Sequence, residues 1–263
     1  MVYFLFISLT MIAGYILGYF FNKDKHICDW LDREYTTCIK GIAILTVLWA
    51  HVGKVFSIPF IQFIAGIGVS LFLICSGYGL ERSFEKNRFK NFWSKRIHSV
   101  YLPLVIVICV VSFIKLTFIH NFDIVVFLKA VFLVSVNWYI RFLFICYLAF
   151  FFIKKIVSGS NRIKELHLWI LFITVSFFFY SILIDDVSAP FLEARQVLSF
   201  PFGVYLAKKL NNEYECADKK RWFLLTIVLG VVGLIFMGIT QTGEIKHLPY
   251  VISNGMALLT CFP

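Results

Sequence analysis

The segment Lys40-Gly-Ile-Ala-Ile-Leu-Thr-Val-Leu-Trp-Ala-His51 has a basic residue and a histidine at the two ends of an apolar run. A separation of eleven residues is about three helical turns, so a helix would carry both side chains on one face. The rise is about 16 Å, roughly half the hydrocarbon thickness of a bilayer. One end can lie at a membrane surface while the imidazole lies deep inside, where an ionisable side chain is costly and usually functional.

The composition extends this interpretation to the whole chain. Hydrophobic residues make up 60% of its 263 residues and charged residues 15%, which indicates a polytopic membrane protein. Only helices satisfy all their backbone polar groups inside a membrane, so we expect an all-α bundle of about nine to ten transmembrane helices. We also expect a chain truncated at its C-terminus, because the last apolar run has no polar flank. The apolar runs lie near 2–21, 39–60, 62–80, 99–119, 122–137, 138–153, 166–184, 196–207, 222–240 and 247–262.

We expect a single transmembrane domain over residues 1–263, because no repeat, linker or second composition is visible. The run 2–21 lacks a basic leading region and a good cleavage site, so it is interpreted as a retained span. The seven cysteines are scattered, and no disulfide framework or metal site is expected from them. The net charge of +10 comes from short basic loops, which membrane topology requires, and does not indicate a nucleic-acid partner.

The distribution of basic residues predicts the orientation. Lys and Arg are concentrated in a first loop, at Lys23, Lys25 and Arg33, and in loops 81–98, 154–165 and 208–221, which the positive-inside rule assigns to the cytoplasm. All four fit there if 122–137 does not fully cross the membrane. That segment is short and contains Asp123 and Lys129, so we expect it to be re-entrant or to lie at the outer surface. The N-terminus then faces outward.

His51 and Lys40 are the first candidates for chemistry. A neutral imidazole can take a proton from a hydroxyl and return it to a leaving group near neutral pH. Lys40 can hold an anion at the inner mouth of the helix. The alternative is a core histidine bonded to a neighbouring backbone, flanked by a lysine whose ammonium reaches the membrane surface. Their spacing alone does not decide between these interpretations.

Two further segments allow both a structural and a functional interpretation. In the span after His51, the small residues Gly66, Ser70 and Gly77 share one face, and close helix packing is favoured over a direct role for Ser76. The segment 92–103 combines basic and aromatic residues at a helix entrance, which suits a phosphorylated, planar ligand such as the coenzyme A nucleotide. Composition alone favours an ordinary basic flank there.

Arg141 lies near the outer start of another helix. It can pair with an acidic residue of an outer loop, bind an acceptor, or anchor the helix at the interface.

These segments, in this order, resemble the membrane acyltransferase 3 family. Its first motif, a basic residue, ten residues and a histidine, is matched by Lys40 and His51, with Lys where Arg is usual. Its second motif, Gly-x-Gly-Val-x-Leu-Phe-x-x-x-Ser-Gly-Tyr, is matched from Gly66 to Tyr78. The resemblance makes 33–263 the family-like core and 2–21 an additional N-terminal span.

The third motif of the family, Lys-Arg-x-x-Arg followed by a proline, is matched by Lys95, Arg96 and Pro103. Ser99 stands where the second arginine would be, which removes one positive charge from the expected acyl-CoA site. His98 is a partial replacement for that charge.

The resemblance implies an enzyme of the bacterial cytoplasmic membrane, embedded in lipid. It would move an acyl group, expected to be acetyl, from cytoplasmic acyl-CoA to a hydroxyl of an extracytoplasmic or lipid-linked glycan, without a metal. Two alternatives stay open: a transporter or flippase of glycan intermediates, whose usual inverted repeat is not visible, and an inactive truncated family member. The implied site residues are His51 and Lys40 for catalysis and Lys95, Arg96, Ser76, Tyr78 and Arg141 for substrate binding.

Overall fold

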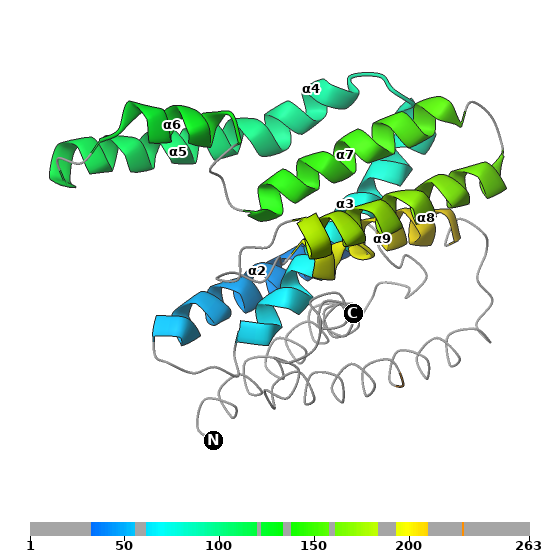
Figure 1. Ribbon diagram of the computed structural model, residues 1–263, viewed down its shortest axis with the longest axis horizontal. Helices are drawn as coiled ribbons and strands as arrows, with labels where there is room; N and C mark the ends of the chain where they lie inside the picture. Colours follow the sequence, from blue (N-terminus) through cyan, green and yellow to red (C-terminus); the bar gives the residue numbers. More distant parts are fainter. Residues whose placement is uncertain are drawn as a thin grey trace. The chain divides into compact units, whose positions relative to one another are not determined.

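The computed structural model describes residues 33–55, 62–119, 122–133, 138–157, 161–183, 193–209 and 228. Within these ranges every regular element is a helix, as predicted (Figure 1). The predicted spans 2–21, 222–240 and 247–262 lie outside the described residues, apart from residue 228, so the total of nine to ten helices stays a prediction. The α-helices are α2 (Arg33–Val55), α3 (Gln62–Asn87), α4 (Phe92–Arg96), α5 (Leu102–Ile114), α6 (Ile124–Val131), α7 (Trp138–Ile156), α8 (Arg162–Phe178) and α9 (Ser199–Lys209).

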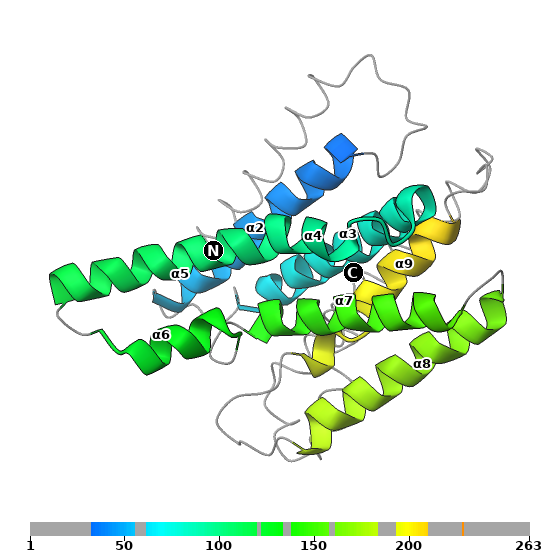
Figure 2. The ribbon, with the colours of Figure 1, turned by 90° about the horizontal axis from the view of Figure 1, so that it is seen from above.

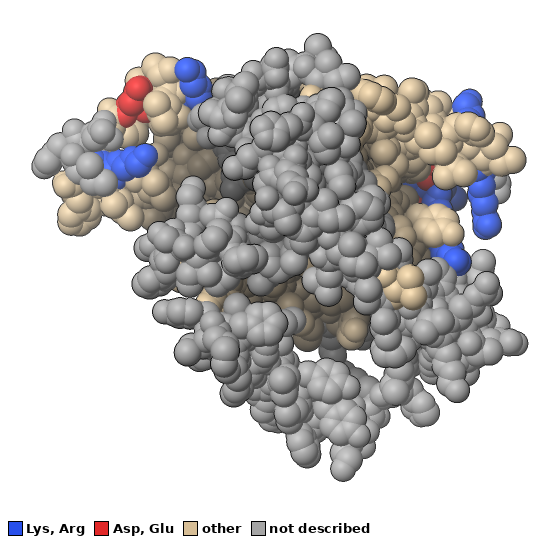
Figure 3. Space-filling view, turned by 60° about the horizontal axis from the view of Figure 1, so that its bottom comes forward, with Lys and Arg blue, Asp and Glu red and all other residues tan. Residues whose placement is uncertain are grey.

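Three described stretches are long and apolar enough to cross a membrane: Tyr35–Val52, Phe92–Phe118 and Arg162–Ser181. The exposed side chains of α5 and α8 are largely apolar, including Phe113 and Val175. Figure 3 shows Lys and Arg gathered in a few places on the face it presents, while nearly all other described residues there carry no charge. Such a surface suits contact with lipid rather than water.

The chain divides into two compact units, residues 1–39 and 40–263. The described part of the first unit is the beginning of α2. All contacts discussed below lie within the second unit.

Helices α3 and α9 pack closely through glycine (Figure 2). A Cβ atom on Gly77 would collide with the carbonyl of Phe200, and one on Gly203 would collide with the carbonyl of Ile74. Gly66 and Ser70 face the same side, through hydrogen bonds to Gln196 just before α9. The packing interpretation of this small-residue face is therefore confirmed.

The polar contact between α3 and the start of α9 depends on one buried amide. Gln196 accepts a hydrogen bond of 2.6 Å from Ser70 Oγ and donates one of 3.1 Å to the carbonyl of Gly66. Ser199 Oγ donates to the same Gln196 oxygen at 3.2 Å. A buried amide with these partners avoids the cost of unsatisfied polar atoms and fixes the register of the two helices.

Helix α6 is too short to cross a bilayer. Its eight residues rise about 12 Å. Asp123 begins the helix by accepting a hydrogen bond of 2.7 Å from the Val125 amide. The helix lies beside α5 (Figure 2), and its Val131 carbonyl accepts a hydrogen bond from the Tyr101 hydroxyl. The described part of 122–137 thus agrees with the prediction that this segment does not fully cross.

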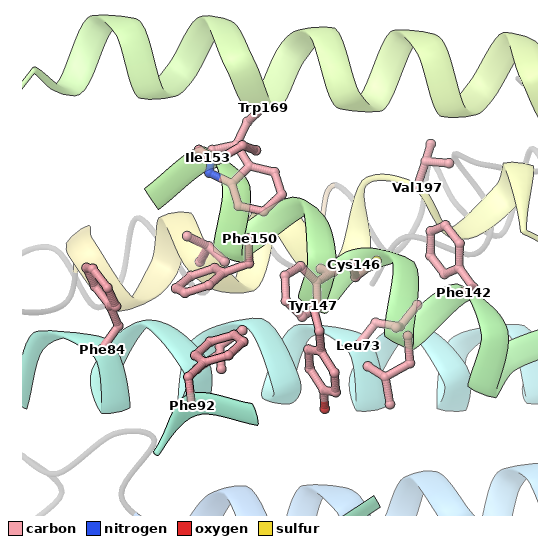
Figure 4. Packing of buried hydrophobic residues seen from close by; sticks show 14 of the residues in the cluster. Leu73, Phe84, Phe92, Phe142, Cys146, Tyr147, Phe150, Ile153, Trp169 and Val197 are labelled. Atoms are coloured by element: carbon pink, nitrogen blue, oxygen red, sulfur yellow. The ribbon is translucent and has the colours of Figure 1, made fainter. Parts of the chain in front are cut away.

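Aromatic side chains from four helices form the core. Phe84 of α3, Phe150 of α7 and Trp169 of α8 are buried (Figure 4). Phe200 of α9 is buried in the same cluster. Phe150 meets Phe84 and Trp169 at centroid distances of 5.8 and 6.4 Å, in edge and tilted geometries that aromatic rings prefer.

A buried ion-pair network joins the ends of the same four helices. Lys154 Nζ of α7 lies 2.6 Å from Glu81 of α3 and 2.9 Å from Glu165 of α8. Lys208 of α9 lies 2.5 Å from the second oxygen of Glu165. These contacts bring the C-terminal ends of α3, α7 and α9 to the N-terminal end of α8. These helix ends, from which the basic loops begin, therefore share one side of the described bundle, as the topology prediction requires.

Candidate active site

The face of α2 that carries Lys40 and His51 packs against α3. Ala43 and Val47 lie on this face, and both approach Gly68 of the second motif. A Cβ atom at Gly68 would collide with Thr46 Oγ1 and with the carbonyl of Ala43. The first two motifs are therefore adjacent in space, and Gly68 is required for their close approach.

Lys40 and His51 stay apart, because the helix between them is continuous. Lys40 is half-buried and close enough to Cys75 of α3 to interact electrostatically with its thiol. His51 is exposed, about 16 Å away along the helix axis. Lys40 is thus placed beside the residue before Ser76, and His51 lies three turns away toward the other end of α2.

Ser76 and Tyr78 belong to different environments. Ser76 Oγ donates a hydrogen bond of 2.7 Å to the Phe72 carbonyl, and the serine lies close enough to the Tyr147 hydroxyl to interact with it. The Tyr78 ring is buried, and its hydroxyl accepts a bond of 3.3 Å from Arg82 Nε. The structure brings Ser76, and not Tyr78, to α7.

Arg96 is half-buried between aromatic rings. Its guanidinium carbon lies 5.7 Å from the Phe92 centroid and 5.6 Å from that of Tyr147. Its Nε is buried without a hydrogen-bond partner among the described residues. No carboxylate of the described part of the chain pairs with this guanidinium. Lys95, in contrast, is exposed.

The backbone after Arg96 widens into a π-helical turn, η2 (Ile97–Tyr101). Pro103, the second residue of α5, has no N–H to donate to a carbonyl one turn earlier, which favours irregular hydrogen bonding here. His98 Nδ1 and Ser99 Oγ bond to the carbonyls of Ser94 and Lys95 at 2.8 and 2.6 Å. Both side chains are exposed and engaged with the backbone of their own helix.

Arg141 lies in a separate part of the bundle. It is exposed and lies 3.6 Å from the buried carboxylate of Glu193, which confirms a pairing with an acidic residue of the segment before α9. Burial raises the pKa of the Glu193 carboxyl, and its own backbone hydrogen bond and Arg141 oppose this rise.

The sequence did not reveal Tyr147 or the network around Lys154. Tyr147 is one of many aromatic residues in an apolar run, and only its contacts with Arg96 and Ser76 distinguish it. Glu81 and Lys154 resemble ordinary polar ends of spans. A signal was nevertheless present, because an acidic residue directly after an apolar run is less common than a basic one on the cytoplasmic side.

The third motif thus supplies a cation that no carboxylate of the described residues pairs with, and the three motifs follow one another in the order of a known family. The sequence model of that family, described as "Acyltransferase domain", matches residues 29–262. The chain belongs to the acyltransferase 3 family. No curated protein and no solved structure matches the chain. Together with its apolar helices, the family makes the protein an integral-membrane acyltransferase.

Proposed function

We propose that this membrane acyltransferase moves an acyl group, with acetyl as the expected group, from cytoplasmic acyl-CoA to a hydroxyl of an extracytoplasmic or lipid-linked glycan. The proposal rests on the surroundings of Arg96. Its side chain is a half-buried guanidinium with no acidic partner in the described part of the chain. A phosphate of coenzyme A is a ligand that would compensate such a charge.

Nearby residues extend this donor site. Lys95 is exposed one position before Arg96 and can contact a second phosphate oxygen. Lys40 and Ser76 lie along α2 and α3, where the pantetheine arm would run toward His51 and place the thioester there. The shared side of the basic loops, assigned to the cytoplasm by charge, supports donor entry from that side.

His51 acts three turns along α2 from Lys40. As general base it removes the proton of the glycan hydroxyl while the oxygen attacks the thioester carbonyl. The carbon–sulfur bond then breaks, the coenzyme A thiolate leaves, and the imidazolium returns the proton. Arg141 is the expected contact for the acceptor at the outer side, with Tyr78 as a further substrate-binding residue.

The test uses membranes that contain the full chain, labelled acetyl-CoA, and label recovered in glycan. His51→Gln keeps polarity but cannot transfer a proton near neutral pH, so the rate should fall by about 10²–10⁴-fold. His167→Gln is the matched control, because His167 is exposed on α8 and, among the described residues, bonds only to the Ile163 carbonyl of its own helix. If His51→Gln transfers label at the wild-type rate while accumulating normally, the catalytic assignment is wrong.

The donor site is tested separately through Arg96→Gln. One lost charge-assisted hydrogen bond corresponds to about 1.5–3 kcal/mol, or roughly a 10- to 100-fold higher KM for acyl-CoA. Arg162→Gln, at an exposed position of α8, should leave KM unchanged. An unchanged KM in Arg96→Gln would place the donor elsewhere. Labelled substrate that crosses the membrane without covalent change would favour the transporter alternative.

A further inference from the structure

Two cations lie on one aromatic stack, and only one of them is neutralised in the described part of the chain. The rings of Phe92 and Phe150 lie nearly parallel, with centroids 6.1 Å apart and an angle of 5° (Figure 4). Lys154 Nζ lies 5.4 Å from the Phe150 centroid, and the Arg96 guanidinium lies 5.7 Å from that of Phe92. Lys154 also contacts two carboxylates. Lys154 is therefore a structural cation, whereas Arg96 is available for a ligand.

Tyr147 closes the other side of Arg96. Its ring is buried and meets Phe144 and Phe200 in edge contacts, with centroids 6.0 and 6.1 Å away. Its hydroxyl is directed away from Trp169 (Figure 4). The ring is therefore held in place by its packing against Phe144 and Phe200.

Aromatic contact holds a guanidinium without using its hydrogen-bond donors. The attraction runs between the cation and the electron-rich ring faces. The N–H groups of a guanidinium lie in its plane and stay free for the oxygens of a phosphate. This explains why the Arg96 Nε is buried yet has no partner among the described residues.

We propose that Tyr147 and Phe92 are positioning residues. Their rings hold the Arg96 guanidinium between them, so that its N–H groups point to the phosphate oxygens of the acyl donor. The inference rests on the proposed function, since it deepens the donor site described there. Neither aromatic residue touches the reacting thioester. Their effect therefore falls on donor affinity and not on the acyl-transfer step.

The experiment compares three variants on the same helix in the full-length protein. Tyr147→Leu removes the ring, Tyr147→Phe retains it without the hydroxyl, and Phe142→Leu removes a fully buried ring that contacts Tyr180 instead of Arg96. Tyr147→Leu should raise the KM for acetyl-CoA about tenfold while kcat changes less than about twofold. Tyr147→Phe and Phe142→Leu should keep a KM within about twofold of wild type. Equal losses in Tyr147→Leu and Tyr147→Phe would overturn the proposal, because the hydroxyl and not the ring would then matter.

A double variant separates this proposal from the proposed function. If Tyr147 acts through Arg96, Tyr147→Leu should raise KM no further in an Arg96→Gln background. Fully additive effects would overturn the positioning role while leaving the donor site intact. If Arg96→Gln alone leaves KM unchanged, the donor site itself is wrong.

Direct binding supplies a readout independent of turnover. Coenzyme A titrated calorimetrically into purified protein in detergent should bind Tyr147→Leu about tenfold more weakly than Tyr147→Phe. If Tyr147→Leu fails to accumulate, Tyr147→Met replaces it, because methionine fills much of the ring volume without an aromatic face. Wild-type affinity in Tyr147→Met would also overturn the proposal.

Discussion

Ser99 is the residue at which this chain departs from the third motif of its family. Its side chain is exposed and donates only to the Lys95 carbonyl, one turn earlier. A longer side chain can be placed there without displacing a buried neighbour, and residue 99 follows Arg96 by three positions on the helix, so it lies on a nearby face.

We therefore expect Ser99→Arg to fold and to hold or lower the KM for acyl-CoA, because it adds a cation one turn from Arg96. The measurement is acyl-CoA dependence of labelled transfer at two salt concentrations, since an added phosphate contact is weakened by salt. Ser99→Gln is the neutral control of similar length. A KM that rises in Ser99→Arg alone would show that a charge at this position opposes donor binding.

At the scale of elements, glycine decides how closely α3 approaches its neighbours. Gly77 and Gly79 lie two residues apart on α3 but differ in surroundings. A Cβ atom on Gly77 would meet the backbone of Phe200, whereas one on Gly79 would meet nothing within 4 Å. Alanine at either position changes helix propensity in the same way, but only alanine at Gly77 disturbs the contact with α9. Comparing the two variants therefore separates the two effects.

Gly77→Ala should destabilise the protein by about 1–3 kcal/mol, because α9 must move away from α3. Gly79→Ala should be neutral or stabilising by up to about 1 kcal/mol, since alanine favours a helix. Unfolding in detergent, followed by circular dichroism, measures both. Equal stability of the two variants would contradict the close α3–α9 contact.

At the scale of the whole molecule, the network around Lys154 ties four helices together at one end. It contains two lysines and two glutamates, and Lys154 lies 8% exposed at its centre. Removing this lysine leaves Glu81 and Glu165 buried with one cation between them. A buried charge without its partner is strongly destabilising.

Lys154→Met should accordingly lower the free energy of unfolding by about 3–5 kcal/mol. Lys155→Met changes the same residue type at the next position, but that side chain is exposed and contacts only the Phe151 ring among described residues. It should unfold like the wild type. Thermal unfolding in detergent compares them, and similar midpoints for the two variants would show that the network contributes little.

The same network predicts that loops 81–98, 154–165 and 208–221 lie on one side of the membrane. After replacement of the native cysteines, single cysteines at positions 86 and 155 should resist an impermeant reagent in intact cells and react once the membrane is permeabilised. A cysteine at position 186, in an acidic outer loop, should react from outside. Outside labelling at position 155 but not at 86 would mean that 122–137 crosses the membrane.

Much of the fold was predictable because the signals are local. An apolar run can satisfy its backbone only as a helix, and a motif is read from consecutive residues such as Gly66 to Tyr78. The membrane class, the approximate helix positions and the family follow from this alone. The short α6 was also predictable, because Asp123 and Lys129 interrupt its apolar run.

Which residues carry charge follows from the sequence, whereas which of those charges are neutralised follows from the packing of the helices. Lys154 and Arg96 look alike as basic residues at the ends of apolar runs. Lys154 meets Glu81 from 73 positions earlier in the chain, whereas Arg96 meets two aromatic rings and no carboxylate among the described residues. Such pairings depend on helix packing over long sequence distances, and no local pattern records them. The packed bundle, and not any local pattern, therefore sets the surroundings of Arg96, its contact with the Tyr147 ring and the close contacts of Gly77.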